Sequence, residues 1–282
     1  MKTGLIMEGG AMRGLFTAGV IDVFMEQGIE FDGGIGVSAG ATFGSNYKSK
    51  QPGRVLRYNL KYCRDSRYGT VRSWLKSGDL FETKFCYYDL PYELDKVDSE
   101  AFDANPMEFY VVGTDVTTGK AVYRKLDKID DTAMDWFRAS ASMPMVSKIV
   151  EVEGLKLLDG GISDSVPVKY FESIGYDRNV VILTQPKGYQ KTENKLLPLM
   201  KLSLRGYPKV LEAMKNRHLV YNETSIYIEE QEKAGNLLVI RPKEKLPIGR
   251  MSHDPKELQQ VYDLGREAGL AYAEKVKRFL ER

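Results

Sequence analysis

Cysteine and histidine are scarce in this chain, which has two of each among 282 residues. The cysteines, Cys63 and Cys86, match no metal-binding spacing, so we expect buried, reduced thiols and no metal site. Long apolar runs are also lacking: none approaches the ~20 residues of a membrane span, and the run before Glu8 is too short for a signal peptide. We therefore expect a cytoplasmic protein.

An excess of one charge is missing as well. The 41 Lys and Arg residues face 39 Asp and Glu residues, and the formal net charge is +2. So small an excess argues against the basic face of a nucleic-acid-binding protein. Hydrophobic residues make up 43% of the chain, which is enough for a globular protein with a sizeable core.

The amino-terminal part shows one pattern twice. Residues 3–7 form a short apolar run that leads into a glycine loop at 8–14, and residues 15–27 have apolar side chains at helical spacing. The order of strand, glycine turn and helix then recurs over residues 33–49. Two strands joined by such a helix form a right-handed crossover with neighbouring parallel strands, so both glycine loops should lie at one edge of the sheet.

The rest of the first 185 residues continues this alternation. Residues 53–105 show no clear period and predict short helices and loops. Strands alternating with helices predict the α/β class, with three α/β/α layers around a mainly parallel central sheet. The further strands are expected at 108–115, 120–125, 154–161 and 179–185, the last of them buried and parallel, with a helix at 127–139.

No repeat or linker divides the chain. We expect a single domain over residues 1–282, with an α/β core at 1–185 and a mostly helical extension at 186–282 packed on the core. Residues 187–220 hold eight Lys and Arg against two Glu, and residues 255–281 form a charged amphipathic helix. The basic segment either packs its leucines on the sheet and leaves its lysines in water, or forms a lid or a surface that docks on anionic lipid.

One serine, Ser38, lies between Gly36 and Gly40 at the start of a predicted helix. Flanking glycines permit the strained strand–turn–helix elbow that exposes a nucleophilic hydroxyl, where the helix dipole favours developing negative charge. In the alternative interpretation Ser38 caps the helix within a glycine-rich bend.

The glycine loop after the first strand contains Gly9, Gly10, Ala11 and Arg13. Such a loop exposes backbone N–H groups that suit an anion, either a phosphate or an oxyanion. It fails as a dinucleotide fingerprint because Ala11 replaces the second glycine and the next strand ends in Ser38 rather than in an acidic residue. It also lacks the Lys and Ser or Thr of a P-loop, so an oxyanion site beside Ser38 is the remaining interpretation.

A serine nucleophile needs a base. Asp159 follows an apolar strand and precedes two glycines, which places it at the end of a strand where the sites of parallel sheets gather. An isolated aspartate before glycine also caps turns. His253 completes the order Ser, Asp, His of hydrolase triads, whereas otherwise it is a surface or helix-start residue, and His218 lies in a predicted helix of the tail.

Three motifs together resemble the signatures of patatin-like phospholipases: GGAMRG at 9–14, GVSAG at 36–40 and DGG at 159–161. The resemblance covers residues 3–185. RASASMP at 138–144 is similar to the small-residue stretch that this family places before its aspartate.

The resemblance implies a patatin-like fold and a lipid acyl hydrolase that uses a Ser-Asp dyad without cofactor or metal. It assigns Ser38 as the nucleophile, Asp159 as the base and the amides of Gly9, Gly10 and Ala11 as the oxyanion hole. Ala11 departs from the glycine that the family commonly has, and its methyl group is accommodated if its φ stays negative.

Arg13 occupies the basic position of the glycine loop, where it either meets a substrate phosphate or orders the loop by pairing with a carboxylate. The expected partner is a lipid or other acyl ester, with a peripheral contact to the anionic inner membrane surface through residues 187–220. Two alternatives stay open: an acyltransferase with the same acyl-enzyme, and a non-catalytic anion- or nucleotide-binding module. The sequence leaves the oligomeric state open.

Overall fold

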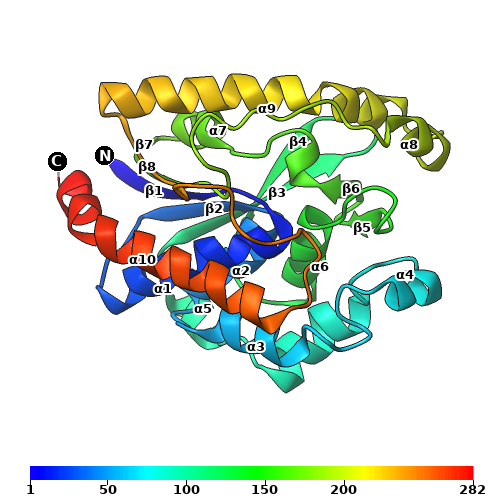
Figure 1. Ribbon diagram of the computed structural model, residues 1–282, viewed down its shortest axis with the longest axis horizontal. Helices are drawn as coiled ribbons and strands as arrows, with labels where there is room; N and C mark the ends of the chain where they lie inside the picture. Colours follow the sequence, from blue (N-terminus) through cyan, green and yellow to red (C-terminus); the bar gives the residue numbers. More distant parts are fainter. Residues whose placement is uncertain (282) are drawn as a thin grey trace.

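The computed structural model describes residues 1–281, which fold around an eight-stranded sheet (Figure 1). The strands are β1 (Lys2–Met7), β2 (Gly33–Val37), β3 (Glu108–Asp115), β4 (Ala121–Leu126), β5 (Val150–Val152), β6 (Leu155–Asp159), β7 (Tyr176–Ile182) and β8 (Leu237–Ile240). Their order is β5-β6-β3-β2-β1-β7-β8, and β4 also pairs with β3. Five neighbouring strands, β3-β2-β1-β7-β8, are parallel, so the predicted mainly parallel sheet is confirmed.

Helices cover both faces of this sheet and confirm the three-layer prediction. The α-helices are α1 (Gly14–Glu26), α2 (Ala39–Lys48), α3 (Arg54–Tyr62), α4 (Val71–Ser77), α5 (Ser99–Ala104), α6 (Asp131–Ser140), α7 (Val168–Ser173), α8 (Leu197–Ser203), α9 (Pro208–Ala234) and α10 (Pro255–Leu280). Two 3₁₀ turns, η1 (Ala11–Arg13) and η3 (Gly160–Ile162), and a π-helical segment, η2 (Phe85–Leu94), complete the described chain. None of the helices within residues 1–281 combines the length and the apolar character that crossing a bilayer requires.

Alternating side chains in the strands divide the core into two layers. In β1, Leu5 and Met7 pack with buried residues of α1, α2 and α10, whereas Ile6 packs on the opposite face with residues of α7 and α9. Successive side chains of a strand point to opposite faces, so a strand buried on both sides reads as a continuous apolar run. Figure 1 shows α9 and α7 on one side of the sheet and α1, α2 and α10 on the other.

The predicted crossover at the amino terminus is confirmed. Strands β1 and β2 are parallel neighbours, with Leu5 opposite Gly34 and Met7 opposite Gly36. The loops that follow the two strands therefore lie at the same edge of the sheet, which brings Gly9 next to Ser38.

The strand predicted before Asp159 is present, and the structure adds its direction, which the sequence had left open. Strand β6 runs antiparallel to β3, with Asp159 opposite Gly113, and it forms a hairpin with β5. The hairpin turn is Glu153-Gly154, whose φ values of 49° and 76° are both positive, as a type I′ turn requires. Asp159 still reaches the carboxyl edge of the parallel strands, because β6 ends opposite the last part of β3.

The carboxy-terminal extension is not purely helical. Strand β8 adds to the parallel sheet beside β7, with Val181 opposite Val239, and this strand was absent from the sequence-based prediction. Helix α10 crosses α1 at glycine contacts: a Cβ added to Gly265 would lie 2.1 Å from the carbonyl oxygen of Phe16. The extension is thus packed on the core, as expected.

A buried carboxylate joins α1 to the extension. Asp22 Oδ2 accepts hydrogen bonds from the backbone N–H of Gly53 (2.8 Å) and from the Tyr262 hydroxyl of α10 (2.6 Å), while Oδ1 has no partner among residues 1–281. Burial raises the pKa of Asp22 from 3.8 to about 6. Between pH 3.8 and about 6, the folded protein therefore keeps the Asp22 proton that the unfolded chain has lost. The free energy of unfolding decreases as the pH rises through this range.

We expect Asp22→Asn to raise the free energy of unfolding by up to about 3 kcal/mol at pH 8, and by much less at pH 4, because the amide removes the cost of burying the charge. Urea unfolding at both pH values measures the difference. The exposed Asp263→Asn is the control and should change neither value. An equal increase in the free energy of unfolding at both pH values would contradict the raised pKa of Asp22.

Candidate active site

Ser38 occupies a sharp turn between β2 and α2. Its φ of 55° and ψ of −122° lie where residues with a side chain are strained, and its side chain makes no capping hydrogen bond to α2. Close packing requires the two flanking glycines: a Cβ on Gly36 would lie 2.4 Å from the Gly40 carbonyl oxygen, and a Cβ on Gly40 would lie 2.3 Å from that of Met7. The turn therefore has the geometry of a nucleophile elbow.

Asp159 lies beside the Ser38 hydroxyl at the end of β6, and both residues line one cavity of about 80 Å³. The carboxylate is 2% exposed, and its Oδ1 accepts a hydrogen bond from the Gly161 N–H at 2.7 Å. Burial raises the pKa of Asp159, while Arg217, the Ser38 hydroxyl and the Gly161 N–H act in the opposite direction. Asp159 thus caps η3 and also faces the serine.

The segment 138–144 accepts backbone hydrogen bonds from both Ser38 and Asp159. The Ser38 backbone N–H donates to Ser140 Oγ at 2.8 Å, and the Asp159 backbone N–H donates to the Ser142 carbonyl oxygen at 2.8 Å. Ser140 is fully buried and Ser142 nearly so. The small side chains of this segment allow it to lie close to the turn after β2 and to the end of β6 at once.

The glycine loop supplies unpaired donors. Within residues 1–281, the backbone N–H groups of Gly9, Gly10 and Ala11 donate to no other protein group. The condition stated for Ala11, a negative φ, is not met, because its φ is +52°. An alanine in this left-handed region costs roughly 1–2 kcal/mol, and the strain is held at the edge of the site.

Arg13 is hydrogen-bonded to the loop itself, and it forms no ion pair with a carboxylate within residues 1–281. Its Nε donates to the Gly10 carbonyl oxygen at 3.3 Å, and burial lowers the pKa of its guanidinium, with Glu8 acting in the opposite direction. Glu8 is itself 2% exposed and accepts hydrogen bonds from Thr184 and from the Tyr221 hydroxyl.

Three further cations line the cavity of Ser38 and Asp159: Lys191, Arg217 and Arg250. The sequence analysis did not identify them as site residues. Lys191 and Arg217 belong to the basic stretch 187–220 that was expected to face water or lipid. Burial, reinforced by Arg217, lowers the pKa of Lys191 to about 7. The Nε of Arg217 donates to the Gly161 carbonyl oxygen, two residues beyond Asp159.

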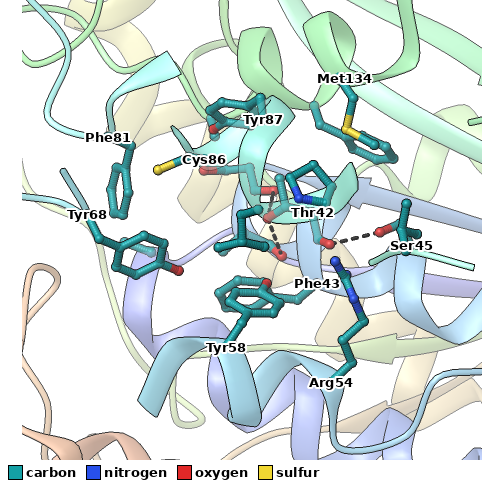
Figure 2. Close-up of a pocket in the computed structure, with 18 of the residues that line it drawn as sticks. Thr42, Phe43, Ser45, Arg54, Tyr58, Tyr68, Phe81, Cys86, Tyr87 and Met134 are labelled. Carbon is teal, nitrogen blue, oxygen red and sulfur yellow. Dashed lines mark hydrogen bonds between the residues drawn. The ribbon is translucent and has the colours of Figure 1, made fainter. Parts of the chain in front are cut away.

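A second cavity, of about 150 Å³, meets the first at Ser38 and Ala11, which line both. Its walls are mainly aromatic and aliphatic. Figure 2 shows Tyr68 and Phe81 at one end and Arg54 at the other, where the guanidinium is paired with Asp95. Further lining residues include Phe43, Tyr58, Tyr87, Leu90, Met134 and Phe137.

The histidines lie apart from these cavities. His253 Nδ1 is 2.7 Å from the Cys63 carbonyl oxygen, and His218 Nδ1 is 3.1 Å from that of Lys215 on α9. Neither histidine lines the cavity of Ser38 and Asp159, so a triad with His253 is not assembled in the described chain. Cys63 is buried as expected, whereas Cys86 is half-buried in the aromatic cavity. No cluster of metal-binding side chains occurs in residues 1–281.

Two family models match the chain. Residues 5–172 match the model described as patatin-like phospholipase, and residues 207–281 match a domain of unknown function, DUF6363.

Several known proteins are similar to the chain along most of its length. The uncharacterized protein YjjU of Escherichia coli is 27% identical, over 99% of this chain and 79% of that protein. Lysophospholipase nte1 of Aspergillus niger is 26% identical over 98% of this chain, which spans only 18% of the fungal protein. The crystal structure of VipD from Legionella pneumophila aligns with a TM-score of 0.46 and 13% identity, over 97% of this chain and 67% of that one.

Proposed function

The chain belongs to the patatin-like phospholipase family, and from this premise we propose that it is a serine lipid acyl hydrolase of the phospholipase A or carboxylesterase type. One observation supports the proposal most directly: Ser38, in a strained turn beside the buried Asp159, borders both the aromatic and the polar cavity. Such a junction suits an ester whose acyl chain and alcohol portion extend to opposite sides of the reacting carbonyl.

In the proposed first half of the reaction, Asp159 accepts the proton of the Ser38 hydroxyl as Ser38 Oγ attacks the carbonyl carbon of the ester. The free N–H groups of Gly9, Gly10 and Ala11 stabilise the oxyanion of the tetrahedral intermediate. When this intermediate collapses, the alcohol leaves with the proton from Asp159, and the acyl group stays on Ser38 as an ester.

In the second half, water attacks the acyl-enzyme and Asp159 accepts a proton from that water. Collapse of the second tetrahedral intermediate returns the proton to Ser38 and releases the carboxylic acid. The raised pKa of Asp159 favours both steps, because a more basic carboxylate accepts a proton more readily. The scheme uses no cofactor and no metal.

Labelling with a fluorophosphonate, together with turnover of p-nitrophenyl esters of graded acyl length, tests the proposal. We expect a covalent adduct on Ser38, located by mass spectrometry, and release of p-nitrophenol. Labelling without hydrolysis would favour the acyltransferase, in which an acceptor other than water takes the acyl group. Failure of both reactions would contradict the proposal and favour a non-catalytic anion- or nucleotide-binding module.

We further propose that the protein is cytoplasmic and makes a peripheral contact with the anionic inner membrane surface. The proposed contact surface includes residues outside the segment 187–220. Exposed apolar side chains gather on α4, with Leu75 74% exposed, and on α8, with Leu202 77% exposed. Exposed cations accompany them, among them Arg72 on α4 and Lys201 on α8. Leucines inserted among lysines and arginines bind anionic bilayers through both apolar burial and charge.

Both helices contact residues 143–145, and Met143 of this segment lines the polar cavity. The indole N–H of Trp74 on α4 donates to the Met145 carbonyl oxygen at 2.9 Å, and Met200 of α8 packs in a cluster with Met143 and Met145. Met143 lines the cavity of Ser38. Figure 1 shows α4 and α8 at the same end of the molecule.

We expect Leu202→Glu to reduce co-sedimentation with phosphatidylglycerol vesicles by about tenfold, because it removes an exposed apolar side chain that would enter the bilayer and adds a charge that the anionic lipid repels. Ile226→Glu is the matched control, since Ile226 is 60% exposed on α9, outside the surface formed by α4 and α8. An equal loss in both variants would contradict the proposed membrane contact.

A further inference from the structure

The polar cavity holds more positive than negative charge. Arg13, Lys191, Arg217 and Arg250 line it, and none of them forms an ion pair with a carboxylate in the part of the chain that the structure describes. The carboxylates in the cavity lining are Glu8 and Asp159. Four cations thus face two anions, an excess of two positive charges when Lys191 is protonated.

The terminal nitrogens of these cations are available to a ligand. Arg13 and Arg217 each use Nε on a backbone carbonyl oxygen, and no hydrogen bond within residues 1–281 occupies their terminal nitrogens. The ammonium of Lys191 lies 3.9 Å from the centre of the Tyr221 ring and has no carboxylate partner in the same range. Arg13, Lys191 and Arg217 are partly removed from water, whereas Arg250 is exposed at the rim of the cavity. Charged groups removed from water without an anionic partner are costly, so the cavity is suited to bind an anion.

The position of Ser38 between the two cavities indicates which part of an ester substrate would be negatively charged. The aromatic cavity on one side of Ser38 suits an acyl chain, so the alcohol portion of the ester lies in the basic cavity. A phosphomonoester has a charge of about −1.5 to −2 at neutral pH, which matches the excess of two positive charges that the cavity has when Lys191 is protonated. The head group of a choline or ethanolamine phosphodiester is zwitterionic, and its ammonium would be repelled by the arginines.

We infer that the preferred substrate is an acyl ester whose alcohol portion bears a phosphomonoester, bound by Lys191, Arg217 and Arg250 beside Arg13. The inference rests on the proposed hydrolase function. Three of these four cations lie outside residues 5–172, the segment that matches the patatin-like model. The carboxy-terminal extension therefore determines the substrate's head group, while the patatin-like segment performs the chemistry.

The test compares kcat/KM for three esters with the same acyl chain, presented as monomers: a monoacylglycerol phosphate, the corresponding lysophosphatidylcholine and the neutral monoacylglycerol. We expect the phosphomonoester to be preferred by about tenfold to a hundredfold, the range that charge-assisted hydrogen bonds provide. Lys191→Met should reduce this preference by about tenfold through KM, and Lys191→Arg should retain it. Lys187→Met, at an exposed lysine four positions earlier, is the matched control and should retain it fully.

Each other outcome has a distinct meaning. Equal losses on all three esters in Lys191→Met would show a structural role and overturn the inference. Competitive inhibition by inorganic phosphate without any preference among the lipids would show a site for free phosphate, and would overturn it too. In both cases the hydrolase proposal stands, because p-nitrophenyl esters report on it separately. Failure of every ester, together with no labelling of Ser38, overturns the proposed function itself.

Discussion

Ester hydrolysis is expected to fall by about 10⁴-fold or more in kcat/KM when Ser38 is replaced by alanine. The substitution removes the atom proposed to form the acyl-enzyme and leaves the proposed oxyanion donors of the glycine loop in place. Asp159→Asn should cause a loss of similar size, because the amide has the same shape and can still accept the Gly161 N–H, yet cannot take up a proton. Both variants should keep their fold, which circular dichroism and the unfolding midpoint would verify.

The matched control for this prediction is His253→Gln, which should retain the activity of the natural protein. His253 interacts with the Cys63 carbonyl oxygen and does not line the cavity of Ser38. Loss of activity in His253→Gln with full activity in Asp159→Asn would replace the dyad by a serine-histidine mechanism.

Gly265→Ala should lower the free energy of unfolding by about 3 kcal/mol or more, the largest effect on stability expected here. The new methyl group would lie 2.1 Å from the Phe16 carbonyl oxygen, and backbone atoms of a helix cannot move aside as a side chain does. Helix propensity favours alanine by only about 1 kcal/mol, so the clash dominates. Because α1 begins directly after the glycine loop, displacement of α10 should also disturb the proposed oxyanion donors.

Gly206→Ala provides the control, since a Cβ at Gly206 meets nothing within 4 Å. We propose that the core and the extension form one domain, as expected from the sequence, and therefore unfold in a single transition measured by urea denaturation. Two separate transitions in Gly265→Ala, with activity retained after the first, would contradict this proposal.

Local patterns in the sequence predicted the part of the site that is built from residues close together in the chain. The glycines around Ser38 and the repeated strand–turn–helix order were sufficient to place Gly9 beside Ser38, because each connection is short and its handedness is fixed. The direction of β6 could not be inferred from an apolar run alone. The pair Glu153-Gly154 between two alternating segments was the available signal, since such a turn joins antiparallel strands.

The basic cavity could not be predicted in this way. Lys191 and Arg217 lie in a stretch of alternating leucines and cations, and such a composition does not reveal whether a cation faces water or the interior. Their orientation depends on how α9 packs across the sheet, far from Ser38 in sequence. The same is true of Arg250, which lies near the glycine loop because the Met12 N–H donates to its carbonyl oxygen at 3.4 Å.

The topology of the sheet keeps both ends of the described chain away from the site. Thr3 pairs with Arg178 in the neighbouring strand, and the guanidinium of Arg178 reaches the carbonyl oxygens of Phe279 and Leu280. The beginning of β1 and the end of α10 thus meet at the amino edge of the sheet, about 20 Å along the strand from the glycine loop. An affinity tag or an immobilising tether at either end would therefore leave the cavities and the surface formed by α4 and α8 facing outward, which suits surface-based binding assays on supported bilayers.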